Sequence, residues 1–409
     1  MRIRHLVRAS LVGVLLAGLL GVPAPHSGLA APALPVPAEY ADLYPALEAK
    51  LKAVDAHITP RWTGTKHDVI FSAELLAANS NQGDQLFKDQ AWQAVILNLD
   101  RMQPLGIRGV KAAIKYPILV PAFPRSAEYL DFYRRLSQEL KRRNLRFLAQ
   151  MTAGFREPAF STLPVTEYYK GLTLERYRQE KRQMAETIIR EIRPDYLTIE
   201  NEPGTQQENT GLPFTVQNVT EIVQHIVKGL DRSGVLVGAG AGTWDDLAYI
   251  QHLVQTPVDY IDIHIYPVNR DYLVDRAFKI GEIAARANKK LALGEAWLYK
   301  SRDQELGGRA VAAAPALFAR DVFSFWEPLD IEFLTTMVKL SHYLKIDFAS
   351  FFWSRYFFAY VEYNDGTRSL RPTELFRRAN VEAAKNMLAS PPQFTKTGLA
   401  FQRLIKTGP

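Results

Sequence analysis

The chain has 409 residues, of which 47% are hydrophobic and 23% are charged, the composition of an ordinary globular protein. It contains no cysteine, which excludes a disulfide scaffold, thiol chemistry and a lipid-anchored cysteine. The formal net charge is +7, but basic runs such as Lys141-Arg142-Arg143 end an amphipathic helical segment without interleaved aromatic residues. We therefore expect a solvated helix face there and no nucleic-acid partner.

The first segment predicts export. Three arginines in the first eight residues precede the apolar run Leu11–Val22, and small residues around Gly28 offer a cleavage site. This pattern is typical of a signal peptide over residues 1–30, and its apolar run is too short to span a membrane. We expect a secreted or periplasmic protein that has no membrane partner and is a monomer.

A linker rich in proline and alanine and an N-terminal helix are expected over residues 31–60. From there to residue 409, short apolar runs alternate with amphipathic segments about eight times. The runs that predict strands are Val69–Ala73, Ile107–Ala112, Arg146–Gln150, Tyr196–Asn201, Val235–Ala239, Tyr260–Ile265, Leu291–Gly294 and Phe348–Trp353. The segments that predict helices include Glu128–Arg143, Leu174–Ile192, Val216–Leu230, Tyr272–Ala287 and Phe333–Leu344.

Eight alternating βα units predict an α/β fold that closes into a single (β/α)8 TIM barrel over residues 61–409, with the N-terminal helix as an extension. The rival architecture is an open doubly wound sheet, which would need a glycine-rich phosphate turn after its first strand. That strand leads instead into Glu74 and a loop of Asn, Ser and Gly. The segment Ser301–Asp330 lacks a clear strand and predicts a loop insertion over the active site.

Two of the predicted strands are directly followed by a carboxylate. Glu202 follows the fourth strand and Glu295 follows the seventh. The C-terminal strand ends of a parallel barrel collect its active site. Two carboxylates facing each other across a cleft are what glycosidic bond cleavage needs, one as proton donor and one as nucleophile or base.

These motifs resemble the clan A glycoside hydrolases, (β/α)8 barrels that cleave β-linked glycosides with retention. The resemblance is carried by Asn201-Glu202-Pro203 at the fourth strand end and Glu295 at the seventh, and it covers the barrel rather than one family of the clan. It implies that Glu202 is the general acid/base, Glu295 the nucleophile and Asn201 a donor to the sugar 2-hydroxyl. The implied partner is a poly- or oligosaccharide substrate.

The sixth strand carries a third signal. Alternation places Asp262, His264 and Tyr266 on one face, the barrel interior if the intervening isoleucines face the helices. By the resemblance, Tyr266 would hydrogen-bond the nucleophile and His264 would orient the substrate or a carboxylate. A core histidine satisfied by its neighbours is the alternative for His264.

Lys111 stands on the second strand, where many clan members carry an arginine that keeps the nucleophile ionised. A lysine supplies the charge without the bidentate fork, so either Lys111 holds the nucleophile more loosely or this family differs here. Glu200 lies two residues before Glu202 and on a regular strand would point the same way. We expect Glu200 to pair with Lys111 inside the barrel.

Flat aromatic faces at strand ends stack on the apolar faces of sugars. Trp353 on the eighth strand is expected to form a platform under the sugar ring. Trp297 and Trp244 follow the seventh and fifth strands and are expected to line the same cleft, and Trp326 in the long loop is a candidate outer subsite.

Two other functions remain open. A barrel isomerase or lyase could bind a divalent cation through Glu202, His264 and Glu295, although no two histidines share a metal-binding spacing and no cofactor motif is present. We expect no metal and no cofactor. The non-enzymatic alternative is a secreted carbohydrate-binding barrel that has lost catalysis.

Overall fold

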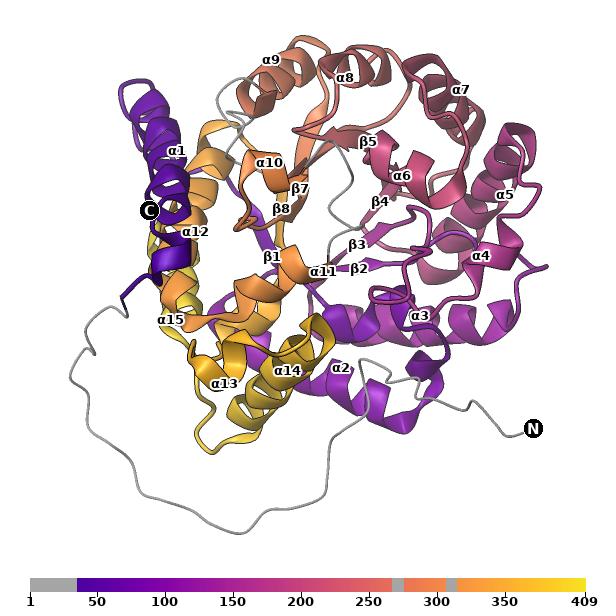
Figure 1. Cartoon of the computed structure of the whole chain (residues 1–409). Helices are drawn as coiled ribbons and strands as arrows, with labels where there is room; N and C mark the ends of the chain where they lie inside the picture. Colours follow the sequence, from indigo (N-terminus) through magenta and orange to yellow (C-terminus); the bar gives the residue numbers. More distant parts are fainter. Residues whose placement is uncertain (1–34, 267–275, 307–314) are drawn as a thin grey trace, which may run out of the picture.

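The computed structural model describes residues 35–266, 276–306 and 315–409. Eight parallel strands pair in chain order and close on themselves, because the first pairs with the eighth as well as with the second (Figure 1). The strands are β1 Ile70–Glu74, β2 Gly109–Ala113, β3 Arg146–Gln150, β4 Tyr196–Glu200, β5 Leu236–Gly242, β6 Tyr260–Ile265, β7 Lys290–Ala296 and β8 Phe348–Phe351. The predicted (β/α)8 barrel is confirmed, and the open sheet is excluded.

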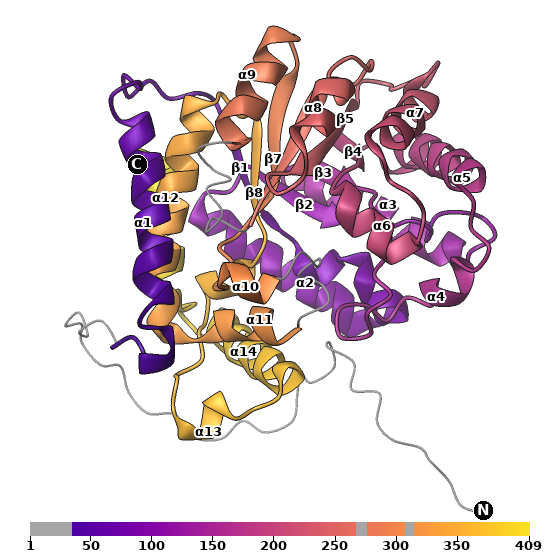
Figure 2. The ribbon, with the colours of Figure 1, turned by 45° about the horizontal axis from the view of Figure 1, so that its top comes forward.

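Helices form a ring outside the barrel (Figures 1 and 2). The α-helices are α1 Leu43–Ile58, α2 Asp89–Met102, α3 Ser126–Arg142, α4 Val165–Tyr168, α5 Leu174–Thr187, α6 Pro203–Thr210, α7 Val216–Val227, α8 Leu247–Leu253, α9 Phe278–Arg286, α10 Asp303–Leu306, α11 Pro315–Ala319, α12 Glu327–Tyr343, α13 Asp365–Arg368, α14 Pro372–Leu388 and α15 Lys396–Thr407. Short turns are η1 Ala38–Tyr40, η2 Leu76–Ala78, η3 Ser80–Phe87, η4 Gln103–Leu105, η5 Ile188–Ile192, η8 Arg320–Val322, η9 Ser324–Trp326 and η10 Ser354–Phe357.

The strand and helix predictions hold, with small shifts at their ends. β3 and β6 begin and end at the predicted residues, and the predicted helix Leu174–Ile192 is α5 followed by the π-helical turn η5. The start of the predicted helix Tyr272–Ala287 lies outside the described residues, and α9 covers its remainder. None of the helices in the described ranges is long and apolar enough to cross a membrane.

The core has two parts because parallel strands bury both faces. Inside the barrel, one layer consists of Leu148, Tyr196, Tyr260, Ala292 and Phe348. The larger part lies between the strands and the helices. Since the inner layer closes the barrel below the C-terminal strand ends, polar side chains above it form the floor of a site rather than a channel.

The N-terminal helix α1 packs lengthwise on α12, which also contacts the C-terminal helix α15 (Figure 2). Leu47, Leu51 and Val54 of α1 are fully buried in the same core as the barrel helices. The segment predicted as a loop insertion contains α10 and α11 and the turns η8 and η9, and its residues 307–314 lie outside the described ranges. The insertion contacts the N-terminal extension, because Trp326 of η9 stacks on Tyr44 of α1.

Candidate active site

Glu202 begins a helix instead of ending a strand. β4 stops at Glu200, and Glu202 is the N-cap residue of α6 with a left-handed backbone, φ 48° and ψ 66°. This conformation is uncommon for a residue other than glycine and marks a position that its surroundings hold. Pro203 follows at the first helical position, where its missing N–H costs nothing. The sharp change of direction carries the Glu202 side chain over the barrel mouth.

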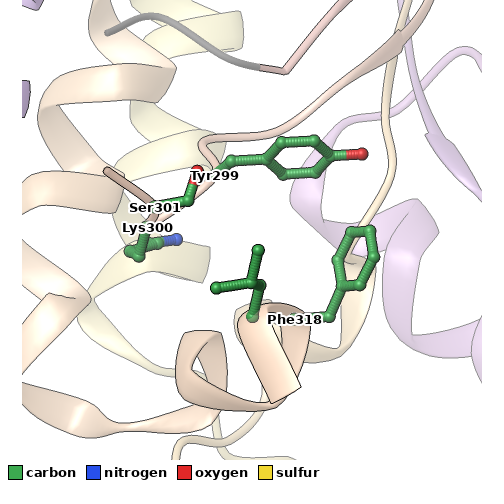
Figure 3. A pocket seen from close by; sticks show the side chains of 5 residues that line it. Tyr299, Lys300, Ser301 and Phe318 are labelled. Atoms are coloured by element: carbon green, nitrogen blue, oxygen red, sulfur yellow. The ribbon is translucent and has the colours of Figure 1, made fainter. Parts of the chain in front are cut away.

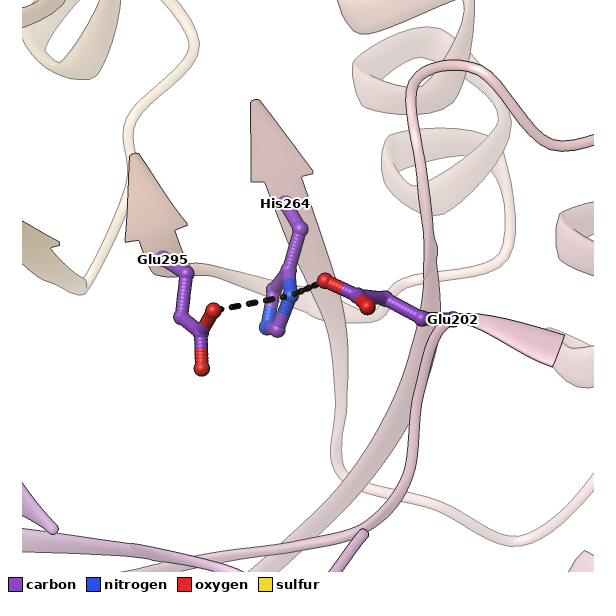
Figure 4. A group of neighbouring side chains, drawn as sticks. All are labelled: Glu202, His264 and Glu295. Carbon is purple, nitrogen blue, oxygen red and sulfur yellow. Dashed lines mark hydrogen bonds and ion pairs between the residues drawn. The ribbon is translucent and has the colours of Figure 1, made fainter. Parts of the chain in front are cut away.

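Glu202, Glu295 and His264 converge above the strand ends (Figure 4). His264 Nδ1 lies 2.6 Å from Glu202 Oε1 and 3.7 Å from Glu295 Oε2. One oxygen of each carboxylate and one ring nitrogen all lie within 4.8 Å of one another. Two carboxylates and an imidazole, from the start of α6, from β6 and from β7, therefore face one small space.

Both oxygens of Glu295 are held. Lys111 Nζ donates to Oε1, and the Tyr266 hydroxyl donates to Oε2 across 2.6 Å. Burial alone would raise the pKa of Glu295, but the positive charges of Lys111, His264 and Lys115 outweigh it and lower that pKa to about 2. The Glu295 carboxylate is therefore ionised and fixed in direction at neutral pH.

His264 is fully buried and protonated. Burial lowers its pKa, but Glu295, a hydrogen bond with Asp262 and the nearby Glu202 raise it to about 10. Its Nε2 lies 2.9 Å from the amide nitrogen of Gln150, whose oxygen has no partner, and a protonated ring favours this amide turned so that the oxygen accepts from Nε2. The imidazolium thus donates to Glu202 on one side and is held from β3 on the other.

Asp262 fixes the floor of the site. Its carboxylate accepts from Thr198 Oγ1 at 2.7 Å and from the backbone N–H of Gly294 at 2.8 Å. A Cβ atom at Gly294 would meet the Asp262 carboxylate at 2.3 Å, so only glycine fits there. Asp262 therefore ties β4, β6 and β7 together just below the catalytic groups.

Asn201 is fully buried and links the start of α6 to strand β6. Its Oδ1 accepts from the Glu202 N–H at 2.7 Å, and its Nδ2 donates to the Asp262 carbonyl at 3.2 Å. The structure thus gives the Asn201 amide a structural task beside the predicted contact with the sugar 2-hydroxyl, namely to hold the backbone of Glu202.

The predicted Glu200–Lys111 pair is wrong. The pairing of β4 with β5 shifts between Thr198 and Glu200, and this bulge turns Glu200 out of the barrel. Glu200 accepts from the Tyr177 hydroxyl at 2.9 Å and lies 3.3 Å from Lys181, both on α5. Alternation along a regular strand fails here because one residue is inserted.

Lys111 pairs instead with two carboxylates inside the barrel. Its Nζ lies 2.8 Å from Glu74 Oε2 at the end of β1, in addition to its contact with Glu295. All three side chains are largely or wholly buried. The Lys111 ammonium therefore lies between the carboxylates of β1 and β7, in contact with both Glu74 and Glu295.

The four tryptophans named as candidate sugar contacts differ in how deeply they are buried. Trp353 keeps 9% of its surface exposed, and Trp244 is partly buried with its ring 6.0 Å from that of Tyr266. The predictions for Trp297 and Trp326 are corrected, because neither side chain has any exposed surface for a sugar. Trp297 packs on Phe333 of α12, and Trp326 stacks on Tyr44 of α1. A residue just after a strand end can still point outward into the helix layer.

An aromatic wall runs from Tyr266, which donates to Glu295, to Trp353. The ring of Tyr266 stacks on that of Tyr299 at 4.7 Å, Tyr299 meets Phe318 edge-on at 5.1 Å, and Phe318 lies 6.4 Å from Trp353. Beside this wall, Tyr299, Lys300 and Ser301 face Leu317 and Phe318 of α11 across a small pocket (Figure 3). The insertion after β7 thus contributes a wall of the site, through Phe318.

Sequence reasoning gave no catalytic-site role to Glu74, Lys115, Asp245 or Tyr299. Lys115 follows β2, is buried, and donates from Nζ to Thr152 Oγ1 at 2.5 Å. Its charge acts on both Glu202 and Glu295. The one available signal was its position four residues after Lys111, just beyond a strand end.

The comparisons with known proteins find the same barrel fold in solved glycoside hydrolases. Sequence searches match no protein-family model and no curated protein. GH5_18 from Streptomyces cattleya, solved with GlcNAc, is 14% identical over 84% of this chain and 82% of its own, with a TM-score of 0.53. GH5_18 from Bifidobacterium longum subsp. longum is 12% identical over 82% and 78%, with a TM-score of 0.52.

A β-glucosidase from Thermotoga maritima, solved with deoxynojirimycin, is also similar. It is 11% identical, the match covers 84% of this chain and 99% of the glucosidase, and the TM-score is 0.52. At these identities the similarity concerns the fold alone, and the chemistry of this chain depends on its own residues.

Proposed function

We propose that the protein is an exported β-glycoside hydrolase that cleaves a poly- or oligosaccharide with retention, with Glu202 as general acid/base and Glu295 as nucleophile. The observation that carries this proposal is the approach of the two carboxylates to within 4.8 Å. Retaining glycosidases place their carboxyl groups about 5–5.5 Å apart, whereas inverting enzymes separate them by about 6.5–9.5 Å to admit a water molecule. The short approach supports double displacement.

In the first step, Oε2 of Glu295 attacks the anomeric carbon. This oxygen points across the site toward His264 and Glu202 (Figure 4). Lys111 holds the other oxygen, Oε1. The bond from the anomeric carbon to the leaving oxygen breaks, and the Glu202 carboxyl proton passes to that oxygen. The products of the step are a glycosyl ester on Glu295 and a free alcohol.

In the second step, Glu202 acts as a base. It takes a proton from a water molecule, whose oxygen attacks the anomeric carbon and displaces Glu295 as a carboxylate. His264 donates to Glu202 at 2.6 Å and so stabilises the charge that Glu202 carries between the steps. The sugar leaves with its original anomeric configuration, and both glutamates regain their starting protonation.

The metal-dependent isomerase or lyase uses the same three side chains, which are close enough to hold an ion. Two charges disfavour it. The Lys111 ammonium already neutralises Glu295, and a pKa near 10 keeps His264 protonated, whereas a metal ligand must be neutral imidazole. The non-catalytic barrel is disfavoured because an ionised carboxylate buried beside Lys111 serves no purpose in stacking a sugar.

The ligands in the similar structures suggest which substrates to test first. A structure of GH5_18 from Streptomyces cattleya holds Manβ1-4GlcNAc, and the Thermotoga maritima β-glucosidase holds deoxynojirimycin. We therefore place β-mannosides and β-glucosides first among the aryl glycosides and polysaccharides to be tested. Trp353 and the wall formed by Tyr266, Tyr299 and Phe318 supply the stacking surface.

Proton NMR of the product in the first minutes of turnover tests the proposal. We expect the released sugar to carry the β configuration before it mutarotates. A first product of α configuration contradicts the retaining mechanism, and no cleavage of any β-glycoside contradicts the proposed function. Export is tested separately by N-terminal sequencing of secreted material, which we expect to begin near Ala31.

A further inference from the structure

Helix α6, which starts at the catalytic Glu202, lacks a cap from its own N-cap residue. The side chains of Thr173, Thr215 and Asp246 each accept a backbone N–H at the start of α5, α7 and α8, respectively. Glu202 cannot do so because its carboxylate is turned to His264. The first N–H groups of α6 need an acceptor from another part of the chain.

Asp245, in the loop after β5, lies at the position of that acceptor. Its Oδ2 accepts from the Gly242 N–H at 2.8 Å, which fixes the carboxylate on its own loop. On the other side, Oδ1 lies 3.5 Å from where a Cβ of Gly204 would stand, so the carboxylate faces the first turn of α6. Gly204 is the second residue of α6, where a capping oxygen belongs.

The loop that carries Asp245 is itself anchored. The Asp245 N–H donates to the Gly242 carbonyl at 3.0 Å, and Arg276 Nη1 donates to the Asp245 carbonyl at 2.7 Å. A carboxylate held at both its side chain and its backbone is a rigid support. Burial raises the pKa of Asp245 to about 7, and the charge of Glu202 acts in the same direction.

We propose that Asp245 is a positioning residue: as the cap that Glu202 cannot supply, it fixes the start of α6 and hence the backbone from which Glu202 reaches its place. The inference rests on the proposed function of Glu202. Asp245 contacts backbone groups and no reacting atom, so it acts on the reaction through the placement of Glu202 and through its charge.

The test compares Asp245→Asn and Asp245→Ala with Asp246→Asn. The Asn variant keeps the size but turns one acceptor into a donor that faces a backbone N–H, and the Ala variant removes both acceptors. Asp246 is the matched control, because it is the exposed neighbour and accepts the Ala248 N–H at 2.9 Å. The three variants and the wild type are assayed on aryl β-glycosides of one sugar, with leaving groups from dinitrophenol to phenol.

We expect the two Asp245 variants to keep kcat/KM for the dinitrophenyl glycoside within about threefold and to lose at least about tenfold for the phenyl glycoside, since only the poor leaving group needs the proton donor. Asp246→Asn should match the wild type on both. An equal loss on both substrates would mean a general structural role and overturns the inference, as does no loss on either.

A second measurement does not depend on activity. In crystal structures we expect the contact of 2.6 Å between Glu202 Oε1 and His264 Nδ1 to persist in Asp246→Asn and to lengthen in Asp245→Ala. An unmoved Glu202 in Asp245→Ala overturns the inference. If the wild type cleaves no glycoside, the proposed function fails, while the crystal structures still decide whether Asp245 places Glu202.

Discussion

The ammonium of Lys111 donates directly to Oε1 of Glu295 inside the barrel. A second carboxylate, Glu74, lies 2.8 Å from the same nitrogen. Lys111 thus pairs with two carboxylates at once, Glu295 in the site and Glu74 below it. Because Glu74 is fully buried and its pKa is raised by burial, Lys111 serves chiefly to keep Glu295 ionised.

Replacing Lys111 with Met should raise the pKa of Glu295. With the lysine, that pKa is about 2, so the nucleophile stays ionised when the pH falls below 4.5, the ordinary pKa of a glutamate. Without it, burial dominates, and Glu295 takes up its proton at a higher pH. The acid limb of kcat/KM should therefore move to higher pH, and activity should fall by about 10²–10³-fold in weak acid and by less at alkaline pH.

Lys115→Met should have a smaller effect than Lys111→Met, because Lys115 lowers the pKa of Glu295 less than Lys111 and His264 do. Its acid limb should move in the same direction by a smaller amount. An acid limb that stays in place in Lys111→Met, with activity lost equally at every pH, would show that the lysine does not control the ionisation of Glu295.

The barrel and its two glutamates could be predicted from the sequence because both depend on local pattern. Apolar runs of strand length, separated by amphipathic segments, leave few topologies. The resemblance placed Glu202 and Glu295 at strand ends, where the structure also brings His264 and Tyr266. His264 and Glu295 lie on β6 and β7, and Glu202 and Tyr266 follow within two residues of the ends of β4 and β6.

The remainder depends on features that local pattern does not contain. The outward turn of Glu200 follows from a bulge between β4 and β5, and a bulge is a relation between two strands. The burial of Trp297 depends on Phe333 and Tyr356, which come later in the chain. The contact of Asp245 with α6 likewise joins two loops, so periodicity could not reveal it.

Glu200→Gln should lower stability but leave catalysis intact. Glu200 faces α5, where it pairs with the wholly buried Lys181. Its replacement by a neutral glutamine leaves the Lys181 ammonium without a counter-charge. Breaking a buried ion pair costs about 3–5 kcal/mol, so the free energy of unfolding in urea should fall by about that amount. The double variant with Lys181→Met should recover part of the loss, because it leaves no unpaired charge. A stable Glu200→Gln protein with no activity would place Glu200 in the site after all.

His264 should stay protonated throughout the neutral range, since its pKa is raised to about 10 and the proton is lost only as the pH approaches that value. Nitrogen-15 NMR should show both ring nitrogens protonated at pH 7. An imidazolium cannot bind a metal ion, so EDTA should leave kcat unchanged. Loss of activity in EDTA, restored by a divalent cation, would favour the isomerase or lyase instead.

Glu202→Gln and Glu295→Gln should both fold and should fail in different ways. Each change keeps size and hydrogen-bonding capacity but removes the carboxylate. Glu202→Gln should lose about 10²–10⁴-fold in kcat/KM on a phenyl glycoside, whose leaving group needs a proton, and far less on a dinitrophenyl glycoside. Its second step lacks a base, so the glycosyl-enzyme should accumulate and be detectable by mass spectrometry.

Azide separates the two variants further. In Glu202→Gln it should attack the accumulated ester without help from a base and release a β-glycosyl azide, which restores turnover. Glu295→Gln cannot form the ester, so no leaving group should produce a labelled protein, and its loss should exceed about 10⁴-fold with every substrate. If azide gives an α-glycosyl azide with Glu295→Gln, the carboxylate was shielding that face of the sugar and the nucleophile is still Glu295. If the covalent label is found on Glu202, the two roles are reversed.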